Sequence, residues 1–109
     1  MVSKDVMNSV EKYIKVLLKN GYEIEKVLLY GSYASQTALS DSDIDLAIVL
    51  SNLKKERYKV IEDLLKVAWR IDPRIEPIPF SSEIFAKGNW IPIIAEIKEK
   101  GIEIRCKNN

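Results

Sequence analysis

Apolar residues recur at two different spacings along the chain, and the change from one spacing to the other separates helices from strands. Between Ser3 and Asn20 they fall three or four positions apart, at Val6, Val10, Tyr13, Ile14, Leu17 and Leu18. This spacing predicts an amphipathic helix that begins after Ser3 as its N-cap and ends at Gly21. The apolar segment Ile24 to Tyr30 then predicts a first strand.

A second strand is expected from Asp43 to Leu50. Beyond Asp45 it is apolar on both faces, as in a central strand that is covered by helices on each side. Between the two strands, Ser32 to Gln36 predicts a short helix, and Thr37 to Ser42 predicts a polar loop.

The next helix is expected to be capped by Ser51 or Asn52 and to end near Asp72-Pro73. Its apolar face would carry Tyr58, Ile61, Leu64, Leu65 and Ala68. Arg74 to Phe80 predicts a third strand that contains Pro77 and Pro79. Backbone N–H groups two residues apart point to the same side of a strand, so this side lacks two donors. The strand is therefore expected at a sheet edge, or to leave the sheet there.

The last part of the chain predicts a short helical turn from Ser81 or Ser82 to Gly88 and then a helix capped by Asn89, with Pro92 in its first turn. That helix is expected to end at Gly101, and 102–105 predicts a brief final strand. The element order predicts one α/β or α+β domain over residues 1–109, a mixed sheet flanked by helices.

Composition excludes several classes of site. The chain has 109 residues, a formal net charge of +1 and no histidine, which rules out Ser-His-Asp triads, Cys-His pairs and zinc sites that use histidine. Its four glycines cannot build a G-x-G-x-x-G or Walker-type phosphate loop. A near-neutral charge argues against strong nucleic-acid binding. The single cysteine, Cys106, and the lack of a long apolar run or signal peptide predict a cytoplasmic protein.

Two candidate chemistries follow each other in the sequence: a Gly31-Ser32 turn after the first strand, and Asp43 and Asp45 at the start of the second. Residues two apart on a strand share a face, so both aspartates project together. If the first two strands pair antiparallel, the turn and the aspartates meet at one sheet edge. A parallel crossover to the third strand brings Glu76 to the same edge. Carboxylates that bind Mg²⁺ beside a glycine turn at a helix N-terminus would suit a metal–triphosphate site.

Other interpretations of these residues are structural. The stretch from Asp41 begins like a calcium loop, but an EF-hand requires glycine where Leu46 stands and glutamate where Asn52 stands. Asp43 and Asp45 could instead be solvated acids in the turn before a strand. Gly31 could be an ordinary turn glycine, and Glu76 taken alone reads as a surface acid.

The segment Gly31-Ser32-Tyr33-Ala34, followed by Asp43-Ile44-Asp45-Leu46, resembles the G-S-x-A…S-D-x-D-L signature of the DNA polymerase β-like nucleotidyltransferases. The chain most resembles their smallest branch, the minimal nucleotidyltransferases (MNT), because the catalytic core accounts for the whole of it. The resemblance implies a mixed sheet flanked by helices. It also implies that Gly31 and Ser32 hold the nucleotide triphosphate.

In this family the two aspartates bind Mg²⁺, so the resemblance assigns Asp43 and Asp45 to the metal and to catalysis. It assigns to Glu76 the third carboxylate, which completes the metal site and helps to activate the acceptor hydroxyl. Two positions depart from the family pattern. Ser35-Gln36 stands where the family often has Arg-Gly, and Glu76 stands where the third acid is commonly Asp.

Members of this branch often pair with a helical HEPN protein in toxin–antitoxin systems, and some transfer AMP from ATP to a toxin tyrosine. The resemblance thus implies an Mg²⁺-dependent nucleotidyltransferase that acts as an antitoxin on a HEPN partner. A non-catalytic nucleotide-binding antitoxin, which neutralises its partner by complex formation, is the alternative. A transferase of small molecules is disfavoured, because such enzymes usually have an added domain for the acceptor. A homo-oligomer is left open.

Overall fold

A computed structural model of the protein describes residues 2–39, 41–51 and 55–104. Four helices and four strands follow one another in these residues. In chain order they are α1 (Lys4–Lys19), β1 (Ile24–Tyr30), β2 (Ile44–Leu50), α2 (Arg57–Ile71), β3 (Ile75–Ser81), α3 (Ser82–Lys87), α4 (Pro92–Lys100) and β4 (Ile102–Ile104).

The four strands form one mixed sheet in the order β3-β2-β1-β4. β1 pairs antiparallel with β2 and with β4, whereas β2 and β3 are parallel. This confirms the α+β architecture and the parallel crossover through α2 that the sequence predicted. The first two strands are antiparallel, which was the condition for bringing the glycine turn and the aspartates to one sheet edge. Because β2 is central, its two apolar faces are both covered, as expected for a strand that is buried on each side.

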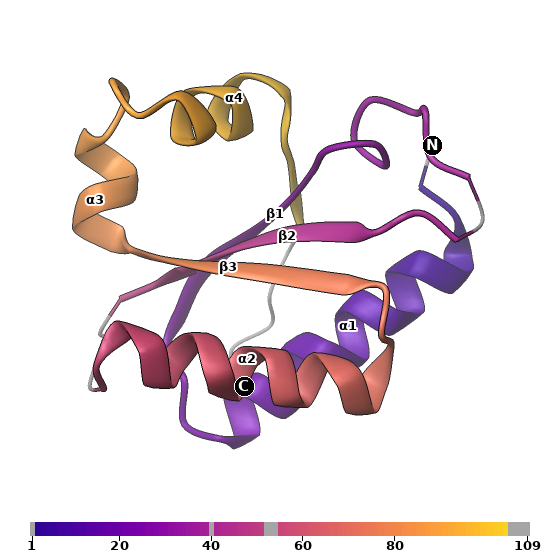
Figure 1. The fold of residues 1–109 in the computed structure, drawn as a ribbon, viewed down its shortest axis with the longest axis horizontal. Coiled ribbons are helices and arrows are strands. Elements are labelled where there is room, and N and C mark those ends of the chain that lie inside the picture. The colour runs from indigo at the N-terminus through magenta and orange to yellow at the C-terminus, as the bar shows by residue number, and fades with distance from the viewer. Residues whose placement is uncertain (1, 40, 52–54, 105–109) are drawn as a thin grey trace.

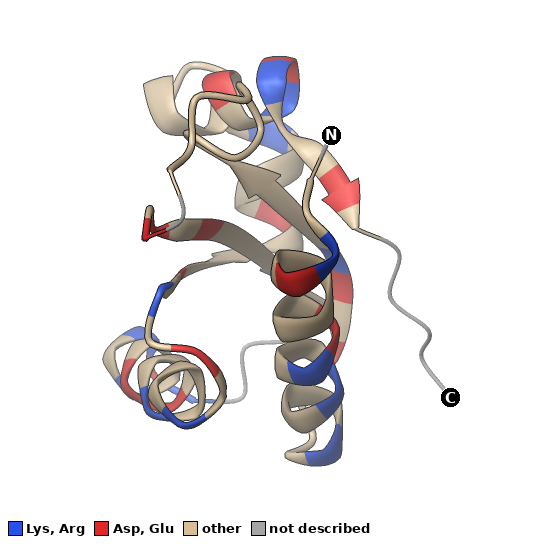
Figure 2. Cartoon of the chain, turned by 90° about the vertical axis from the view of Figure 1, so that its right-hand side faces the viewer, with Lys and Arg blue, Asp and Glu red and all other residues tan. Residues whose placement is uncertain are grey.

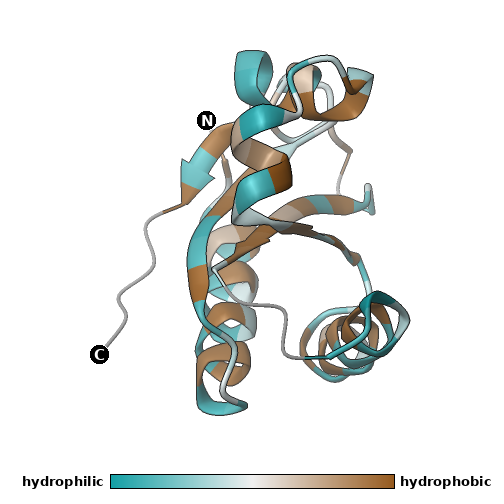
Figure 3. Ribbon diagram, turned by 90° about the vertical axis from the view of Figure 1, so that its left-hand side faces the viewer, coloured by the Kyte–Doolittle hydropathy of each residue, from teal (hydrophilic) through white to brown (hydrophobic). Residues whose placement is uncertain are grey.

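Helices cover both faces of the sheet: α1 and α2 lie on one side, and α3 and α4 on the other (Figure 1). In Figure 3 the hydrophobic faces of these helices turn toward the sheet between them. Alternate residues of β2 point to opposite faces of the sheet and pack in the two hydrophobic clusters on these faces. Ile44, Leu46 and Ile48 belong to the cluster under α1 and α2, and Ala47 and Val49 to the cluster under α3 and α4. Asp45 therefore lies on the α3–α4 face of the sheet.

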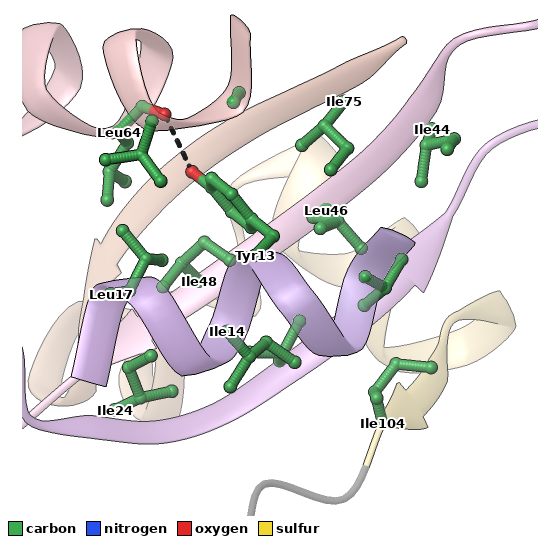
Figure 4. Close-up of a cluster of buried hydrophobic side chains, with 14 of the residues drawn as sticks. Tyr13, Ile14, Leu17, Ile24, Ile44, Leu46, Ile48, Leu64, Ile75 and Ile104 are labelled. Carbon is green, nitrogen blue, oxygen red and sulfur yellow. Dashed lines mark hydrogen bonds between the residues drawn. The ribbon is translucent and has the colours of Figure 1, made fainter. Parts of the chain in front are cut away.

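The larger cluster contains one buried tyrosine whose hydroxyl is satisfied (Figure 4). Tyr13 of α1 is fully buried, and its hydroxyl donates to the carbonyl oxygen of Leu64 in α2 at 2.9 Å. Burial raises the pKa of this phenol well above its ordinary value, so it remains a donor at all physiological pH values. The bond joins the two helices of this layer across the core.

β3 is an edge strand, as Pro77 and Pro79 predicted. The carbonyl oxygen of Pro79 accepts a hydrogen bond of 2.7 Å from the guanidinium of Arg57, in the first turn of α2, so this carbonyl is engaged outside the sheet. On the outer edge of β3, the Pro79 carbonyl is therefore bonded to α2. Pro77 and Pro79 have no backbone N–H with which another strand could pair.

Several predicted boundaries were wrong. No helix follows Ser32; residues 31–36 form turns instead. α2 begins at Arg57 after Glu56, not after Ser51, and Asn52 lies outside the described residues. Tyr58 is 62% exposed, so it does not belong to the buried face of α2. That face is formed by Val60, Leu64, Val67 and Ala68.

The last helix is capped by Ile91 with Pro92 at its first position, not by Asn89. Backbone hydrogen bonds in the preceding turn, such as that from the N–H of Ile91 to the carbonyl of Gly88 at 2.9 Å, delay its start. The short helix after β3 is confirmed, because the side chain of Ser81 accepts from the N–H of Ile84 at 3.2 Å. Arg105 and Cys106 lie outside the described residues. Within the described part of the chain, no helix is long and apolar enough to cross a membrane.

Hydrogen bonds and ion pairs connect the corner between α2 and β3 to α1. Asp72 accepts from the hydroxyl of Ser9 at 2.8 Å and from the guanidinium of Arg74 at 2.7 Å. Arg74 also reaches Asp5 at 2.9 Å. These bonds to its ionised form, that from Arg74 above all, lower the pKa of Asp72 to about 2.

We expect Asp72→Asn to lower the free energy of unfolding by about 1–2 kcal/mol at pH 7, because an ion pair and charge-assisted hydrogen bonds are lost. The folded pKa lies below the unfolded value. The stabilisation is therefore complete above pH 4 and disappears as the pH falls toward 2. Urea titrations of both proteins between pH 6 and pH 2 test this. A stability difference that persisted at pH 2 would show that the carboxylate charge is not its source.

Candidate active site

Three side chains form a row across the sheet at the end where β2 begins. Tyr30 of β1 is the register partner of Asp45 in β2, and Asp45 is the register partner of Glu76 in β3. Register partners on neighbouring strands project from the same face, so the phenol and the two carboxylates stand side by side. The structure thus brings Glu76 to the aspartates, as the topology predicted. Acidic segments mark this end of the molecule in Figure 2.

Asp43 lies just before β2, two residues from Asp45, and is exposed, whereas Asp45 is half-buried. The backbone here is held by a bond of 2.7 Å from the N–H of Ile44 to the carbonyl oxygen of Arg74. The starts of β2 and β3 are therefore fixed to each other directly beside the acids. The aspartates therefore stand at the start of a strand that is paired on both sides.

Gly31 touches the acidic row. It has a φ of +74°, in the left-handed region that favours glycine. A Cβ at this position would collide with the carboxylate oxygen of Asp45, and would stand 3.2 Å from its Cγ. The predicted phosphate turn and the predicted metal ligand are thus in direct contact. Glycine is required here both for its backbone conformation and for the space beside Asp45.

The turn after Gly31 is closed by two backbone hydrogen bonds. The N–H of Ser35 donates to the carbonyl of Gly31 at 3.1 Å, and the N–H of Thr37 donates to the carbonyl of Ser32 at 2.9 Å. Among the described residues, no hydrogen bond uses the N–H groups of Ser32, Tyr33 or Ala34. The expected helix N-terminus is absent. The turn nevertheless offers consecutive backbone donors, the kind of concavity that binds anions.

The carboxylates of Asp43, Asp45 and Glu76 repel one another. Burial raises the pKa of Asp45 above its ordinary value, and the charges of Asp43 and Glu76 raise it further. In the described parts of the chain, no lysine or arginine forms an ion pair with any of these three carboxylates. The site therefore concentrates negative charge that no side chain there neutralises.

This donor set fits a hard divalent cation. Carboxylate oxygens are ligands that Mg²⁺ prefers. A bound cation would also reduce the repulsion between the two aspartate carboxylates, which form no ion pair in the described residues. As they stand, no three acidic side chains in residues 2–39, 41–51 and 55–104 converge closely enough to hold a metal ion. Asp43 and Asp45 are therefore the core of the candidate metal site, and Glu76 adjoins it. Their ligand roles stay predictions.

A separate cavity of about 510 Å³ lies between the first turn of α1, loop residues 33–39 and Arg74. It contains none of the candidate site residues. The acidic row lies on the α3–α4 face of the sheet, whereas this cavity adjoins the first turn of α1. The residues suited to phosphate and metal lie at the acidic row and not in the cavity.

Neutralising Asp45 should stabilise the fold. We expect Asp45→Asn to raise the free energy of unfolding by about 0.2–1 kcal/mol at pH 7, because a carboxylate opposite a like charge is destabilising. Its pKa is raised in the folded state, so the gain should shrink as the pH falls and the wild-type carboxylate becomes protonated. Thermal unfolding tests this, with the exposed Glu11→Gln of α1 as the control. Equal or lower stability of Asp45→Asn would contradict the repulsion.

Two residues of this surface were missed from the sequence. Tyr30 was taken only as the end of a strand, and Glu96 of α4 was not singled out. The charges of Asp45, Glu76 and Glu96 all act on the phenol of Tyr30. The place of Tyr30 directly before the Gly31-Ser32 turn was a usable signal. Nothing in the local sequence marks Glu96, because only the packing of α4 brings it here.

An acidic pair at the start of a central strand, with one of its members against a glycine turn on the neighbouring strand, is the arrangement that the Gly31-Ser32 and Asp43/Asp45 signature predicted. A family model described as "Polymerase beta, Nucleotidyltransferase" matches residues 11–109. The chain belongs to this polymerase β nucleotidyltransferase family of transferases, as a member of its minimal type.

Two relatives come from Methanocaldococcus jannaschii. "Putative protein adenylyltransferase MJ1305" is 35% identical over 83 residues, which are 72% of this chain and 56% of that relative. "Putative protein adenylyltransferase MJ0141" is 28% identical over 102 residues, which are 92% of this chain and 96% of that relative. The chain thus spans little more than half of the first relative and nearly all of the second.

A solved structure described as "Crystal structure of the toxin-antitoxin with AMP-PNP" has a similar fold, with a TM-score of 0.60 and 17% identity. The match covers 93% of this chain and 73% of that one. At this identity the similarity concerns the fold, and it confirms the mixed sheet flanked by helices.

Proposed function

We propose that this protein is an Mg²⁺-dependent nucleotidyltransferase that moves AMP from ATP to a hydroxyl on a partner protein. The observation that carries the proposal is the contact between Gly31 and Asp45. This contact places the Gly31-Ser32 turn, which is suited to binding phosphate, directly beside the carboxylates that are suited to binding a metal ion. Family membership supports the reaction class. The names of the two archaeal relatives support adenylyl transfer to protein.

In the proposed site, Asp43 and Asp45 hold the metal ion, with Glu76 as the third acid. The bound ion would neutralise phosphate charge that the carboxylates alone repel. The N–H groups of the turn after Gly31, with the hydroxyl of Ser32, would hold the outer phosphates. The N–H groups of Ser32, Tyr33 and Ala34, which make no hydrogen bond within the described residues, would be the backbone contacts to phosphate.

The reaction that this arrangement supports is a displacement at the α-phosphorus. The acceptor hydroxyl oxygen forms the new P–O bond, the bond to the bridging oxygen breaks, and pyrophosphate leaves. Glu76, at the outer end of the row and exposed, is the group placed to take the proton of the hydroxyl. The protein's own contribution is mainly positioning and charge.

The acceptor is proposed to be a HEPN-type toxin, which makes this chain a cytoplasmic antitoxin. The related fold seen in a toxin–antitoxin structure with AMP-PNP supports this role. The resemblance of Gly31-Ser32 and Asp43/Asp45 to the MNT signature supports it as well. The alternative is a nucleotide-binding antitoxin that blocks its partner by forming a complex without any transfer.

Labelled ATP tests the proposal. The protein, Mg²⁺ and the product of the neighbouring gene are incubated with ATP that carries ³²P at either the α or the γ position. We expect the partner to retain label from the α position only, and chelation of Mg²⁺ to abolish the labelling. Retention of γ label would indicate a kinase. A complex that forms without any labelling would favour the non-catalytic alternative.

A further inference from the structure

Helix α2 carries an apolar stripe outside its buried face. Each residue of an α-helix turns the chain by roughly 100°, so apolar side chains three or four positions apart share one side of the helix. The stripe consists of Tyr58, Ile61, Leu65 and Trp69, and we call it the outer stripe. Tyr58 is 62% exposed and Trp69 is 65% exposed, whereas Ile61 and Leu65 are partly exposed. Single apolar residues are ordinary on a surface, but a continuous row with two large aromatic side chains indicates an interaction site.

Contacts on the flanks of α2 show which way the outer stripe faces. On one flank, Asp63 accepts from the hydroxyl of Tyr22 at 2.8 Å, so that flank faces the segment between α1 and β1. The outer stripe lies on the opposite flank, next to Arg57, which reaches the edge strand β3. Among the described residues, neither Ile61 nor Leu65 packs against either core cluster. Figure 2, in which α2 is seen end-on, shows α1 on one side of this helix only.

The charges beside the outer stripe make it complementary to itself. Glu62 and Lys66 lie one helical turn apart along its border, half or more exposed, and form an ion pair of 3.3 Å within the helix. An antiparallel pair of α2 helices sets each residue opposite the one equally far beyond the middle of the stripe. Tyr58 then faces Trp69 of a second copy, and Glu62 faces its Lys66. A parallel pair would set Glu62 against Glu62, so the charges favour the antiparallel arrangement.

The size of the outer stripe fits a weak dimer. The four aromatic side chains of two copies would bury roughly 400–700 Å² together, and the neighbouring side chains add to this without reaching the ~1,200 Å² of a standard stable interface. Tyrosine and tryptophan are the residues that protein interfaces favour, with charged residues placed at the rim. The outer stripe has this composition, since its aromatic and aliphatic side chains are bordered by Glu62 and Lys66.

We propose that the outer stripe is the interface of a weak two-fold dimer of this protein, in which two α2 helices pack antiparallel. Ile61 and Leu65 lie at its centre, and Tyr58 of each copy packs on Trp69 of the other. The inference goes beyond the proposed function and does not depend on it. Asp45 lies on the α3–α4 face of the sheet, whereas α2 covers the opposite face, so pairing through α2 leaves both candidate active sites uncovered.

Sedimentation velocity at protein concentrations between about 1 and 500 µM tests the dimer. We expect the wild-type protein to pass from monomer to dimer within this range. Trp69→Ala should weaken the dimer at least about 10-fold, because each dimer loses two aromatic anchors. Trp90→Ala is the matched control. It removes a tryptophan that is 83% exposed but lies outside α2, and it should leave the dimer unchanged.

Charge reversal tests the antiparallel pairing. Glu62→Lys and Lys66→Glu should each weaken self-association by roughly 10-fold, because like charges then face each other twice in every dimer. An equal mixture of the two variants should regain the wild-type affinity, since every facing pair in the mixed dimer has opposite charges. Glu83→Lys and Lys87→Glu are the controls, because they break a similar ion pair on α3, and they should leave association unchanged alone or mixed.

Each result supports or overturns the dimer without reference to AMP transfer, since neither ATP nor an acceptor is present. A wild-type protein that stays monomeric throughout the range overturns it, and so does a dimer that Trp69→Ala leaves intact. A mixture that regains no affinity overturns the antiparallel pairing. If a different protein binds through Trp69 while the wild type stays monomeric, the outer stripe serves that protein and not a second copy. All substituted side chains are at least half exposed, so each variant should unfold within a few degrees of wild type.

Discussion

Changing Asp43 and Asp45 together to asparagine is expected to reduce AMP transfer at least about 10³-fold. Asparagine keeps the size of each side chain but removes the charge that holds the metal ion. Metal ions supply several kcal/mol of transition-state stabilisation, and each 1.36 kcal/mol is a factor of ten in rate. Because Asp45 is destabilised by its acidic neighbours, the double variant should fold at least as well as wild type. The loss would therefore be a loss of chemistry and not of structure.

Transfer is measured as α-label on the partner at saturating ATP and Mg²⁺. The control is Asp41→Asn, an exposed acid in the loop before β2, which should retain wild-type rates. Equal labelling by wild type and the double variant would show that the proposed site is wrong. The same variant tests the non-catalytic alternative in cells. If it still protects cells from the partner, neutralisation by complex formation is the better account.

Gly31→Ala is expected to reduce transfer about 100-fold while the protein still folds. The new methyl group would collide with the Asp45 carboxylate oxygen and push it aside, and a displacement of about 1 Å in a catalytic group can cost this much. The carboxylate is the free end of its side chain, so it can move aside. The stability cost is then mainly that of a non-glycine residue at φ +74°, about 1–3 kcal/mol.

Gly21→Ala provides a matched control for this substitution. Gly21 also has a positive φ, of +91°, but a Cβ there would meet no atom within 4 Å. It should lose a similar amount of stability in urea titrations and keep its transfer rate. If the two variants lost activity equally, backbone strain and not the contact with Asp45 would be responsible.

Most of the sheet could be predicted from the sequence because its signals are local. The first strand ends in the apolar run Val27-Leu28-Leu29-Tyr30, and Pro77 and Pro79 mark an edge by removing donors. The helical crossover between β2 and β3 then restricts this pair to parallel. The row that joins Asp45 to Glu76 follows from this topology, without any knowledge of side-chain packing.

The rest depended on contacts that the sequence does not display. Tyr58 fits the helical spacing of α2 but is exposed, because the helix lies on β3 with a different face. The turn after Ser32 does not become a helix, since Gln36 adopts a positive φ of 62° within it. Glu96 reaches the site only because α4 folds back over β1. Long-range packing of this kind is decided by the whole core.

The edge formed by β3 also limits how other chains can attach to this one. A strand that tried to extend the sheet beyond β3 would find no N–H at Pro77 or Pro79, and it would find the carbonyl of Pro79 already bonded to Arg57. Cross-β stacking of one copy on another is therefore blocked along this side. Any chain that attaches along β3 must therefore rely on side-chain contacts more than on backbone pairing.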